Sequence, residues 1–287
     1  MGYKLKRKLA PLVFLGPYLI VFLLFMIYPI IYSVILSFGK YRAGKIVFVG
    51  IKNYSYLLTD PLFFQSLKVT FTILIIQVPI MTLLALVLGT MMNSLLIKLK
   101  GLFRMFTFMP VLIDTVSYSI IFSLFFNENG GLINNMLNAF GIASLKWFQS
   151  GPLAMFVIMF AITWRWTGYN SVIMLAGLQN ISGDLYEAAD IDGANSFVKF
   201  WRITIPQLKP VIIFSVFNSI NGTLQLFTEP QLLTQGGPAN STLSSVLYLY
   251  NTGFKSFNFG VASAGSYILA IIIAILTFLQ FRATKEN

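Results

Sequence analysis

The sequence predicts an all-α polytopic membrane protein, and three observations lead to this fold class. Apolar residues occupy 57% of the 287 positions and charged residues only 10%, whereas soluble domains carry about 25% charged residues. The charges are also unevenly spread, so that several long stretches carry none. A helix of about 20 apolar residues is long enough to cross the hydrocarbon core of a bilayer. Most of this chain is therefore expected to have lipid as its solvent.

Six apolar stretches are long enough to cross a bilayer. They predict six transmembrane helices within a single transmembrane domain over residues 1–287, at about residues 11–38, 69–97, 103–126, 152–178, 210–228 and 256–281. The first stretch follows a basic start, as a signal peptide does, but it is too long and lacks an A-x-A cleavage site, so we expect it to be retained. The third and fourth stretches each carry a charge near the middle, Asp114 and Arg165.

The distribution of lysine and arginine predicts the orientation of the chain. With the N-terminus inside, the inner segments hold twelve of these residues and the outer segments seven, as the positive-inside rule favours. An even number of spans then places both termini in the cytoplasm. The net charge of +11 arises at the ends of apolar runs, so the expected partner of the basic residues is membrane lipid and not nucleic acid.

The residues that are missing exclude several classes of enzyme and metal site. The chain has no cysteine and no histidine, so we expect no metal site, no thiolate chemistry and no histidine-based catalytic set. The phosphate-binding G-x-x-x-x-G-K-[ST] motif is also absent, which argues against ATP hydrolysis by this chain. We therefore expect a protein that is not itself an enzyme.

The loop between the fourth and fifth spans, residues 180–210, has the pattern of a helix–turn–helix. Asp184 and Glu187 have the spacing of an N-cap and its capping-box partner, and Gly193 suits a left-handed helix end. A second amphipathic stretch, residues 196–203, is expected to end before Pro206. From the residues alone, this loop is either a docking surface for another protein or a connector on the lipid headgroups.

A family resemblance bears on these alternatives. The loop resembles the EAA loop of bacterial ATP-binding-cassette (ABC) importer permeases over about twenty positions, which include Glu187-Ala188-Ala189, Asp192-Gly193-Ala194, Phe200 and Ile203-Thr204-Ile205-Pro206. The resemblance implies a cytoplasmic coupling helix that docks in a cleft of an ATPase subunit. It implies an ATPase-coupling role for eight residues, with Glu187 and Gly193 central among them: Glu187, Ala188, Ala189, Asp192, Gly193, Ala194, Phe197 and Pro206.

Two further segments resemble carbohydrate permeases of the maltose/oligosaccharide type. One is Leu233-Thr234-Gln235-Gly236-Gly237-Pro238-Ala239-Asn240, and the other leads from Trp166-Thr167-Gly168 to Asp184-Leu185-Tyr186. The resemblance covers essentially the whole chain and implies a type I ABC importer permease fold in a bacterial cytoplasmic membrane. It also implies a second homologous permease subunit, two copies of a cytoplasmic ABC ATPase that binds ATP-Mg, and an extracytoplasmic sugar-binding protein. No cofactor is expected in this chain.

Polar residues inside the spans are candidates for a substrate pathway, because such residues are costly in lipid. Polar side chains recur every three or four residues on the fifth span, and a polar and aromatic group lies on the fourth. The candidate pathway residues are Arg165, Trp166, Tyr169, Asn170, Asn218, Asn221 and Gln225. Amides can pair with sugar hydroxyls, but they also join transmembrane helices to one another. Both roles remain open for the stripe on the fifth span.

Asp114 and Arg165 lie about midway along their spans, and we expect them to form a buried ion pair. The predicted function is the permease subunit of an ATP-driven importer of a di- or oligosaccharide. The alternatives are an ABC permease for another solute such as glycerol phosphate, or an ion-coupled carrier that uses Asp114. The sequence shows no convincing internal repeat of the kind that such carriers contain.

Overall fold

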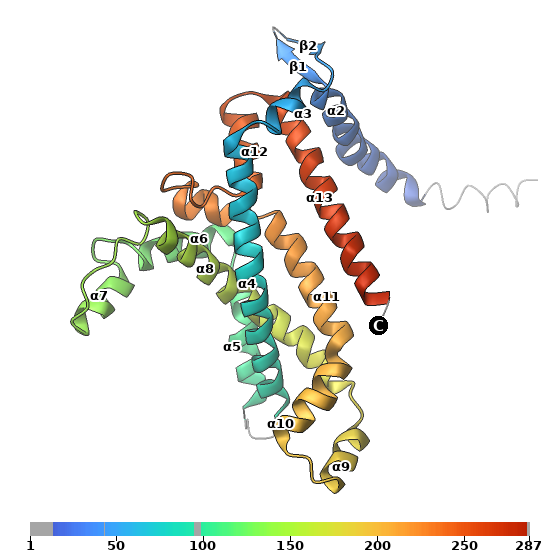
Figure 1. Ribbon diagram of the computed structural model, residues 1–287, viewed down its shortest axis with the longest axis vertical. Helices are drawn as coiled ribbons and strands as arrows, with labels where there is room; N and C mark the ends of the chain where they lie inside the picture. The colour runs from blue at the N-terminus through green and yellow to red at the C-terminus, as the bar shows by residue number, and fades with distance from the viewer. Residues whose placement is uncertain (1–13, 43, 95–98, 286–287) are drawn as a thin grey trace, which may run out of the picture. The chain divides into compact units, whose positions relative to one another are not determined.

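The computed structural model describes residues 14–42, 44–94 and 99–285, and it is mostly helical (Figure 1). The predicted start of the first span at residue 11, the predicted end of the second at residue 97 and the basic N-terminal residues lie outside this part. The chain forms two compact units. One comprises Met1–Asp60 and Leu249–Ala270, and the other comprises Pro61–Tyr248 and Ile271–Asn287.

The first unit contains the first predicted span, which is a helix over Phe14–Ser37. Its other elements are short: β1 (Gly39–Arg42), β2 (Lys45–Phe48), α3 (Lys52–Leu57) and the π-helical turn η4 (Asn251–Lys255). The first helix itself includes the π-helical turn η1 (Leu23–Ile27) and α2 (Tyr28–Ser37). The two strands pair antiparallel, with Gly39 opposite Phe48. This hairpin is a small exception to the all-α expectation, in a loop where hydropathy carries no signal.

Hydrogen bonds join the parts of the first unit. The buried Asn53 amide donates to the carbonyls of Ser37 and Gly39, at 2.8 and 2.9 Å. It thereby satisfies the backbone where the first helix ends and the hairpin begins. The Tyr267 hydroxyl, in the long C-terminal helix, donates to the Ile30 carbonyl at 2.9 Å. These bonds hold both ends of the unit's sequence together.

The second unit is built around two long helices, α4 (Pro61–Asn93) and α8 (Gly151–Gln179). α8 packs along α4 and α5, and α11 packs against both α4 and α8 (Figure 1). The other helical elements are α5 (Lys100–Leu112), α6 (Thr115–Phe125), α7 (Leu132–Ala139), α9 (Gly183–Ile191), α10 (Ser196–Lys199), η2 (Phe200–Thr204), α11 (Ile205–Leu224) and η3 (Pro230–Thr234). α12 (Ser245–Tyr250) and α13 (Phe259–Lys285) each contribute residues to both units.

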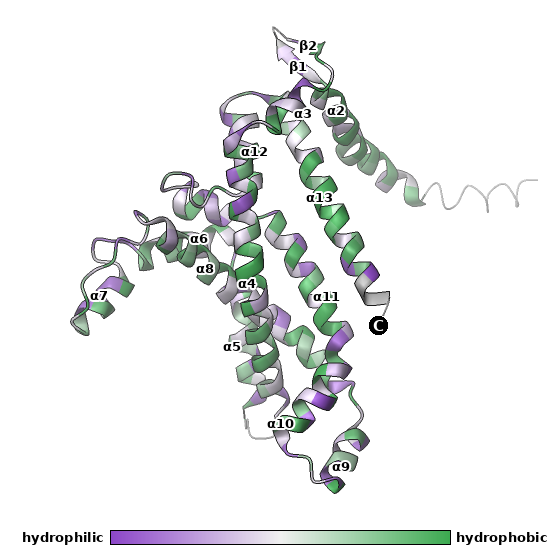
Figure 2. Ribbon diagram, in the orientation of Figure 1, coloured by the Kyte–Doolittle hydropathy of each residue, from purple (hydrophilic) through white to green (hydrophobic). Residues whose placement is uncertain are grey.

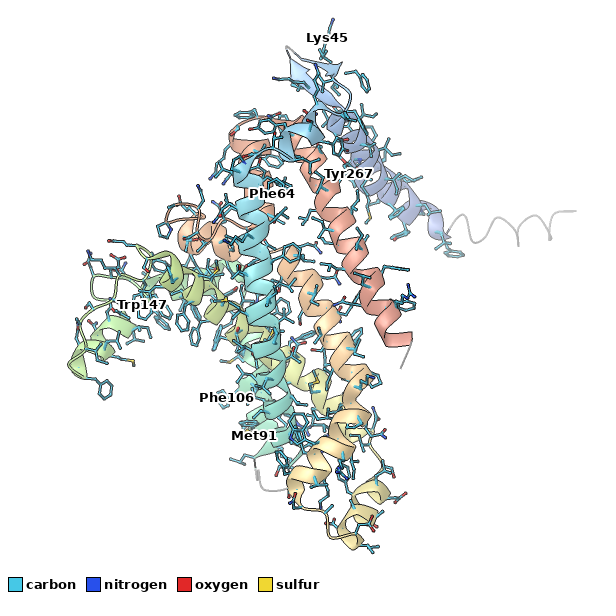
Figure 3. All side chains as sticks on the ribbon, in the orientation of Figure 1. Lys45, Phe64, Met91, Phe106, Trp147 and Tyr267 are labelled. Atoms are coloured by element: carbon cyan, nitrogen blue, oxygen red, sulfur yellow. The ribbon has the colours of Figure 1, made fainter. Side chains whose placement is uncertain are left out.

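The distribution of apolar side chains fits a lipid environment. Figure 2 shows apolar residues along α4 and α13, and more hydrophilic residues at α9 and α10. Met91 and Phe106 are exposed on the outside of α4 and α5 (Figure 3). Large apolar side chains that face outward in this way are stable next to lipid tails and unfavourable in water.

The described residues include four helices that are long and apolar enough to cross a membrane, or five if the bent pair α5–α6 counts as one span. α8 has 29 residues and is long enough, but its second half contains Arg165, Asn170 and other polar residues that lower its hydropathy. α4 begins at Pro61 and not near residue 69. The predicted start follows Lys68, where the uncharged stretch begins, but this lysine is exposed and lies within the helix. The number of six spans stays a prediction.

The third predicted span, residues 103–126, is not one continuous helix. α5 and α6 meet at an angle of 97°, because Ile113 and Asp114 adopt extended backbone conformations. The Asp114 side chain accepts hydrogen bonds from the backbone N–H groups of Val116 and Ser117. It therefore caps the new helix at its first turn, where four N–H groups lack a partner within the helix.

The fifth span also departs from its prediction. The second stretch of the loop does not end before Pro206, because α10, η2 and α11 form one helix over Ser196–Leu224. In its π turn the Ile205 N–H donates to the carbonyl of Phe200, five residues earlier. The wider turn directly before Pro206 lets the helix pass a residue that has no N–H group. The helix ends at Leu224, four residues before the predicted end.

Candidate functional site

A cavity of about 270 Å³ lies within the second unit, between α4, α8, α11 and the segment that follows α11. α4 contributes Gln77 and Met81, and α6 contributes Thr115 from its first turn. The remaining lining comes from the middle of α8 and from residues 218–229. The volume is just below the range of about 300–1,000 Å³ that is typical of small-molecule pockets.

Six of the seven predicted pathway residues line this cavity: Arg165, Trp166, Tyr169, Asn170, Asn218 and Gln225. The seventh, Asn221, is not part of the lining, and its amide donates to the Phe217 carbonyl at 2.9 Å. α11 ends at Leu224, so Gln225 lies just beyond the helix and not on it. The structure thus brings these residues together, while their role in transport stays a prediction.

The cavity wall at α8 carries a positive charge held between aromatic rings. The guanidinium carbon of Arg165 lies 4.9 Å from the centre of the Tyr118 ring and 5.5 Å from that of Trp166. Arg165 also donates a hydrogen bond to the Thr115 hydroxyl. Ring faces attract cations, and more strongly where water is excluded. The rings and the hydroxyl therefore hold the guanidinium in one orientation beside the cavity.

The predicted ion pair between Asp114 and Arg165 is wrong. Asp114 is exposed and is occupied in capping α6, because the helix break leaves N–H groups that need an acceptor. A different carboxylate, Glu229, lines the same cavity as Arg165; it is 5% exposed and accepts a hydrogen bond from Tyr118. Tyr118 thus connects the two charged residues, one over its ring and one at its hydroxyl.

The polar stripe on α11 has one member that joins helices and others that border the cavity. The Ser215 hydroxyl donates to the Asn170 amide oxygen at 2.5 Å, and the Asn170 amide nitrogen donates to the Trp166 carbonyl at 3.0 Å. The first bond joins α11 to α8, as polar side chains do between transmembrane helices, and the second lies within α8 and orients the Asn170 amide. Asn218 and Gln225, farther along, are exposed and line the cavity. Ser215 thus has a structural role, whereas the side chains of Asn218 and Gln225 are exposed at the cavity.

Several lining residues were missing from the prediction. Glu229 continues the three- to four-residue spacing of the stripe, and Gln77 interrupts an otherwise apolar span, so both carried a sequence signal. Thr115 and Met81 carried none, and neither did Tyr118, which contacts Arg165 and Glu229 without being part of the lining, because threonine, methionine and tyrosine are ordinary residues in apolar helices. Their positions depend on the break before α6 and on the packing of α4 against α8.

The predicted coupling loop contains the expected short helix, with one correction at its start. The N-cap of α9 is Ser182 and not Asp184, since the Ser182 hydroxyl accepts from the Asp184 N–H. The end is as predicted, because Gly193 has a φ of +73°. The Gly193 N–H donates to Asp190 and the Ala194 N–H to Ala189, at 3.1 and 2.9 Å. This pair of bonds is the Schellman motif.

The outward surface of the loop combines a free carboxylate with apolar side chains. Glu187 is exposed and has no hydrogen bond within the described part of the chain, so it does not form the predicted capping box. Ile191 and Phe197 are 88% and 71% exposed. The two short helices are tied together by an ion pair of 2.6 Å between Lys199 and Asp190. Tyr186 also bonds Thr204 at 2.9 Å.

The segment 233–240 begins with the last two residues of η3, and residues 235–240 form a compact loop after it. Gln235, Gly236, Ala239 and Asn240 all have positive φ. The Thr242 hydroxyl lies 2.7 Å from that of Thr234, and the Ser244 hydroxyl donates to the Leu226 carbonyl at 2.6 Å. These bonds fix the chain directly after the cavity-lining residues, so the loop supports one wall of the cavity.

Comparisons with known proteins agree with this architecture. The family of the binding-protein-dependent transport system inner membrane component matches residues 70–284. The lactose transport system permease protein LacF of Rhizobium radiobacter is 43% identical over 279 residues, with 96% of this chain and 93% of that protein covered. The arabinooligosaccharides transport system permease protein AraP of Bacillus subtilis is 38% identical over 282 residues, with 96% and 88% covered.

A solved structure shares the fold. It is that of a bacterial ABC transporter involved in the import of the acidic polysaccharide alginate, at a TM-score of 0.87 and 22% identity, with 99% of this chain and 97% of that chain covered. The match spans the cavity and the predicted coupling loop alike. The chain therefore belongs to the binding-protein-dependent transport system inner membrane component family, whose members are membrane permease subunits of ABC transporters and not enzymes.

Proposed function

We propose that this chain is one of two homologous permease subunits of an ATP-driven importer for a di- or oligosaccharide. A second permease would complete the pathway, two copies of an ABC ATPase would bind ATP-Mg in the cytoplasm, and an extracytoplasmic binding protein would deliver the sugar. The named relatives transport lactose and arabinooligosaccharides, which supports this substrate class. Both termini of the chain would lie in the cytoplasm.

The observation that carries the proposal is the chemistry of the cavity. Trp166 and Tyr169 lie edge to face, with ring centres 5.8 Å apart, and Asn218 and Gln225 add amide groups to the same lining. Aromatic faces can pack against sugar rings and amides can pair with hydroxyls, as in ligand pockets that place a few polar groups among apolar ones. One ring-sized part of a sugar would fit the volume.

The exposed surface around Glu187 supports the second half of the proposal. Ile191, Phe197 and Glu187 are exposed, and the Glu187 carboxylate has no hydrogen-bond partner in the described part of the chain. Apolar side chains in this position would be buried against an ATPase subunit on assembly. The helix Ser196–Leu224 runs without interruption from this loop to the cavity. A movement of the ATPases would therefore reach the cavity wall through one continuous helix.

The charges of the cavity lining also support a neutral substrate over an anionic one. Arg165 is the one cation among the described lining residues, and Glu229 lines the same cavity from the segment after α11. A phosphate ester would be repelled by the carboxylate and would have one arginine to pair with. The charge balance in the described lining thus favours a neutral, hydroxyl-rich ligand over glycerol phosphate.

The test is to purify the tagged chain gently from its own cells, to identify its partners by mass spectrometry, and to reconstitute the complex in liposomes. With the binding protein outside and ATP inside, we expect uptake of radiolabelled lactose or an arabinose oligosaccharide, and none of sn-glycerol-3-phosphate. A co-purified P-loop ATPase and a second permease chain are expected. A chain that is purified alone and moves solute without ATP would contradict the proposal and favour an ion-coupled carrier.

A further inference from the structure

Gln77 is a buried polar residue in the middle of α4 that packing does not explain. It is 2% exposed, and it lies within a 33-residue helix whose other residues near this depth are apolar. Its side chain forms part of the lining of the 270 Å³ cavity. It also borders an apolar groove between α4, α5 and α8. The amide therefore lies where the polar lining ends and the apolar surface begins.

The two ends of the Gln77 amide differ in their surroundings. The nitrogen lies 3.4 Å from the Met81 sulfur, a weak acceptor. The oxygen is buried and has no hydrogen-bond partner in the described part of the chain. Asn170, in the same lining, differs in this respect, since its oxygen accepts from Ser215 and its nitrogen donates to Trp166.

An unpaired buried acceptor is unfavourable, because it loses its bonds to water and gains none in the protein. A methionine at this position would have nearly the same shape without that penalty. Folding alone thus gives no reason for glutamine here. A group that binds in the cavity and donates a hydrogen bond would supply the missing partner, and a sugar hydroxyl is such a group.

We propose that Gln77 determines sugar specificity: its amide oxygen accepts a hydrogen bond from one hydroxyl of the sugar ring bound in the cavity. This inference rests on the proposed function of the cavity in sugar import. A sugar that lacks the hydroxyl would leave the oxygen unpaired, and sites built around such a bond reject analogues that cannot form it. The residue would thus select among sugars that the binding protein delivers equally well.

The experiment compares Gln77→Met with a matched control, Gln231→Met. Gln231 also has a buried amide oxygen without a partner, but it lies in η3 and does not line the cavity. Both variants are assembled with the unaltered partner subunits in liposomes. Uptake of lactose and of each of its monodeoxy derivatives is measured at saturating sugar. The readout is the ratio of the lactose rate to each analogue rate, together with the melting temperature of each complex.

We expect Gln77→Met to lower this ratio about tenfold for one ring position and to leave the other ratios unchanged. Its melting temperature should equal or exceed that of the wild type, because the unpaired acceptor is gone. Gln231→Met should keep every ratio. A uniform fall in all rates with a lower melting temperature would show a structural role and overturn the inference, as would unchanged ratios throughout. A wild-type complex that imports no sugar would overturn the proposed function itself.

Discussion

Asn218 and Asn221 lie three positions apart on α11 and have almost the same local bonding. Each donates its amide to the carbonyl four residues earlier, at 3.1 and 2.9 Å. Both were predicted to line the pathway, because a spacing of three or four residues places them near one another on a helix. The structure separates them, since Asn218 borders the cavity and Asn221 does not. Residues on one helical stripe can thus face different neighbours.

This difference leads to a prediction for the two asparagines. Asn218→Ala should lower sugar uptake about tenfold, which corresponds to one lost hydrogen bond of about 1.4 kcal/mol. Asn221→Ala should leave uptake close to that of the wild type. Both rates are measured in liposomes at equal amounts of assembled complex. Equal effects of the two substitutions would show that the cavity is not the pathway.

At the level of elements, the break between α5 and α6 decides what Asp114 does. In a straight span its carboxylate would need a cation, and Arg165 would be the natural partner. In the broken span it finds backbone N–H donors instead, at 2.9 Å from Val116 and 3.4 Å from Ser117. The carboxylate is therefore used for its hydrogen-bonding capacity and not for its charge.

The two roles of Asp114 predict different effects of two substitutions. Asp114→Asn keeps an oxygen that can cap α6, so it should change the free energy of unfolding by only a few tenths of a kcal/mol. Asp114→Ala removes the cap and should destabilise the protein by about 1 kcal/mol. Thermal unfolding of the detergent-purified protein measures both. If asparagine were as harmful as alanine, the negative charge and not the cap would be what matters.

The end of α9 leads to a prediction about coupling. At Gly193 a Cβ atom would meet nothing within 4 Å, but φ is +73°, a conformation that asparagine tolerates and valine does not. Gly193→Val should therefore distort the loop and uncouple ATP hydrolysis from uptake, while Gly193→Asn retains coupling. The ratio of ATP hydrolysed to sugar imported is the measurement. Tight coupling in the valine variant would contradict a docking role for this turn.

At the level of the whole chain, close approaches between helices shape the second unit. A Cβ atom at Gly168 on α8 would collide with the Thr107 carbonyl on α5. A Cβ atom at Gly89 on α4 would lie 2.9 Å from the Met174 Cβ of α8. Small residues allow such approaches in membrane proteins, where van der Waals packing drives helix association. The cavity wall on α8 depends on this packing.

Gly168→Ala should thus displace α8 from α5, lower the melting temperature and reduce assembly with the partner subunits. Gly101→Ala is the matched control, because a Cβ atom there meets nothing within 4 Å and alanine favours a helix over glycine by up to about 1 kcal/mol. Its melting temperature should not fall. Yields of intact complex in detergent give the second readout. Normal assembly of Gly168→Ala would show that α5 can move freely.

Local patterns were sufficient for some features. Gly193 at a left-handed helix end, the short helix before it and the grouping of Arg165, Trp166 and Tyr169 all follow from spacing and residue type over a few positions. The chain's membrane character follows from composition alone, because no packing can hide so many apolar residues from water. The EAA-like loop and the resemblance to carbohydrate permeases likewise need no tertiary information, since their residues are contiguous in the sequence.

Other features depend on contacts between distant segments. Hydropathy does not reveal the 97° break before α6, because a broken and a straight apolar helix have the same composition. Because of this break Asp114 caps α6. Tyr118 contacts both Arg165, through its ring, and Glu229, through its hydroxyl. The free oxygen of Gln77 is also a tertiary fact, since whether a buried amide is satisfied depends on which helices surround it. Composition and local spacing thus determine that the chain enters the membrane and where its loop turns, whereas packing decides which polar groups remain free for a ligand.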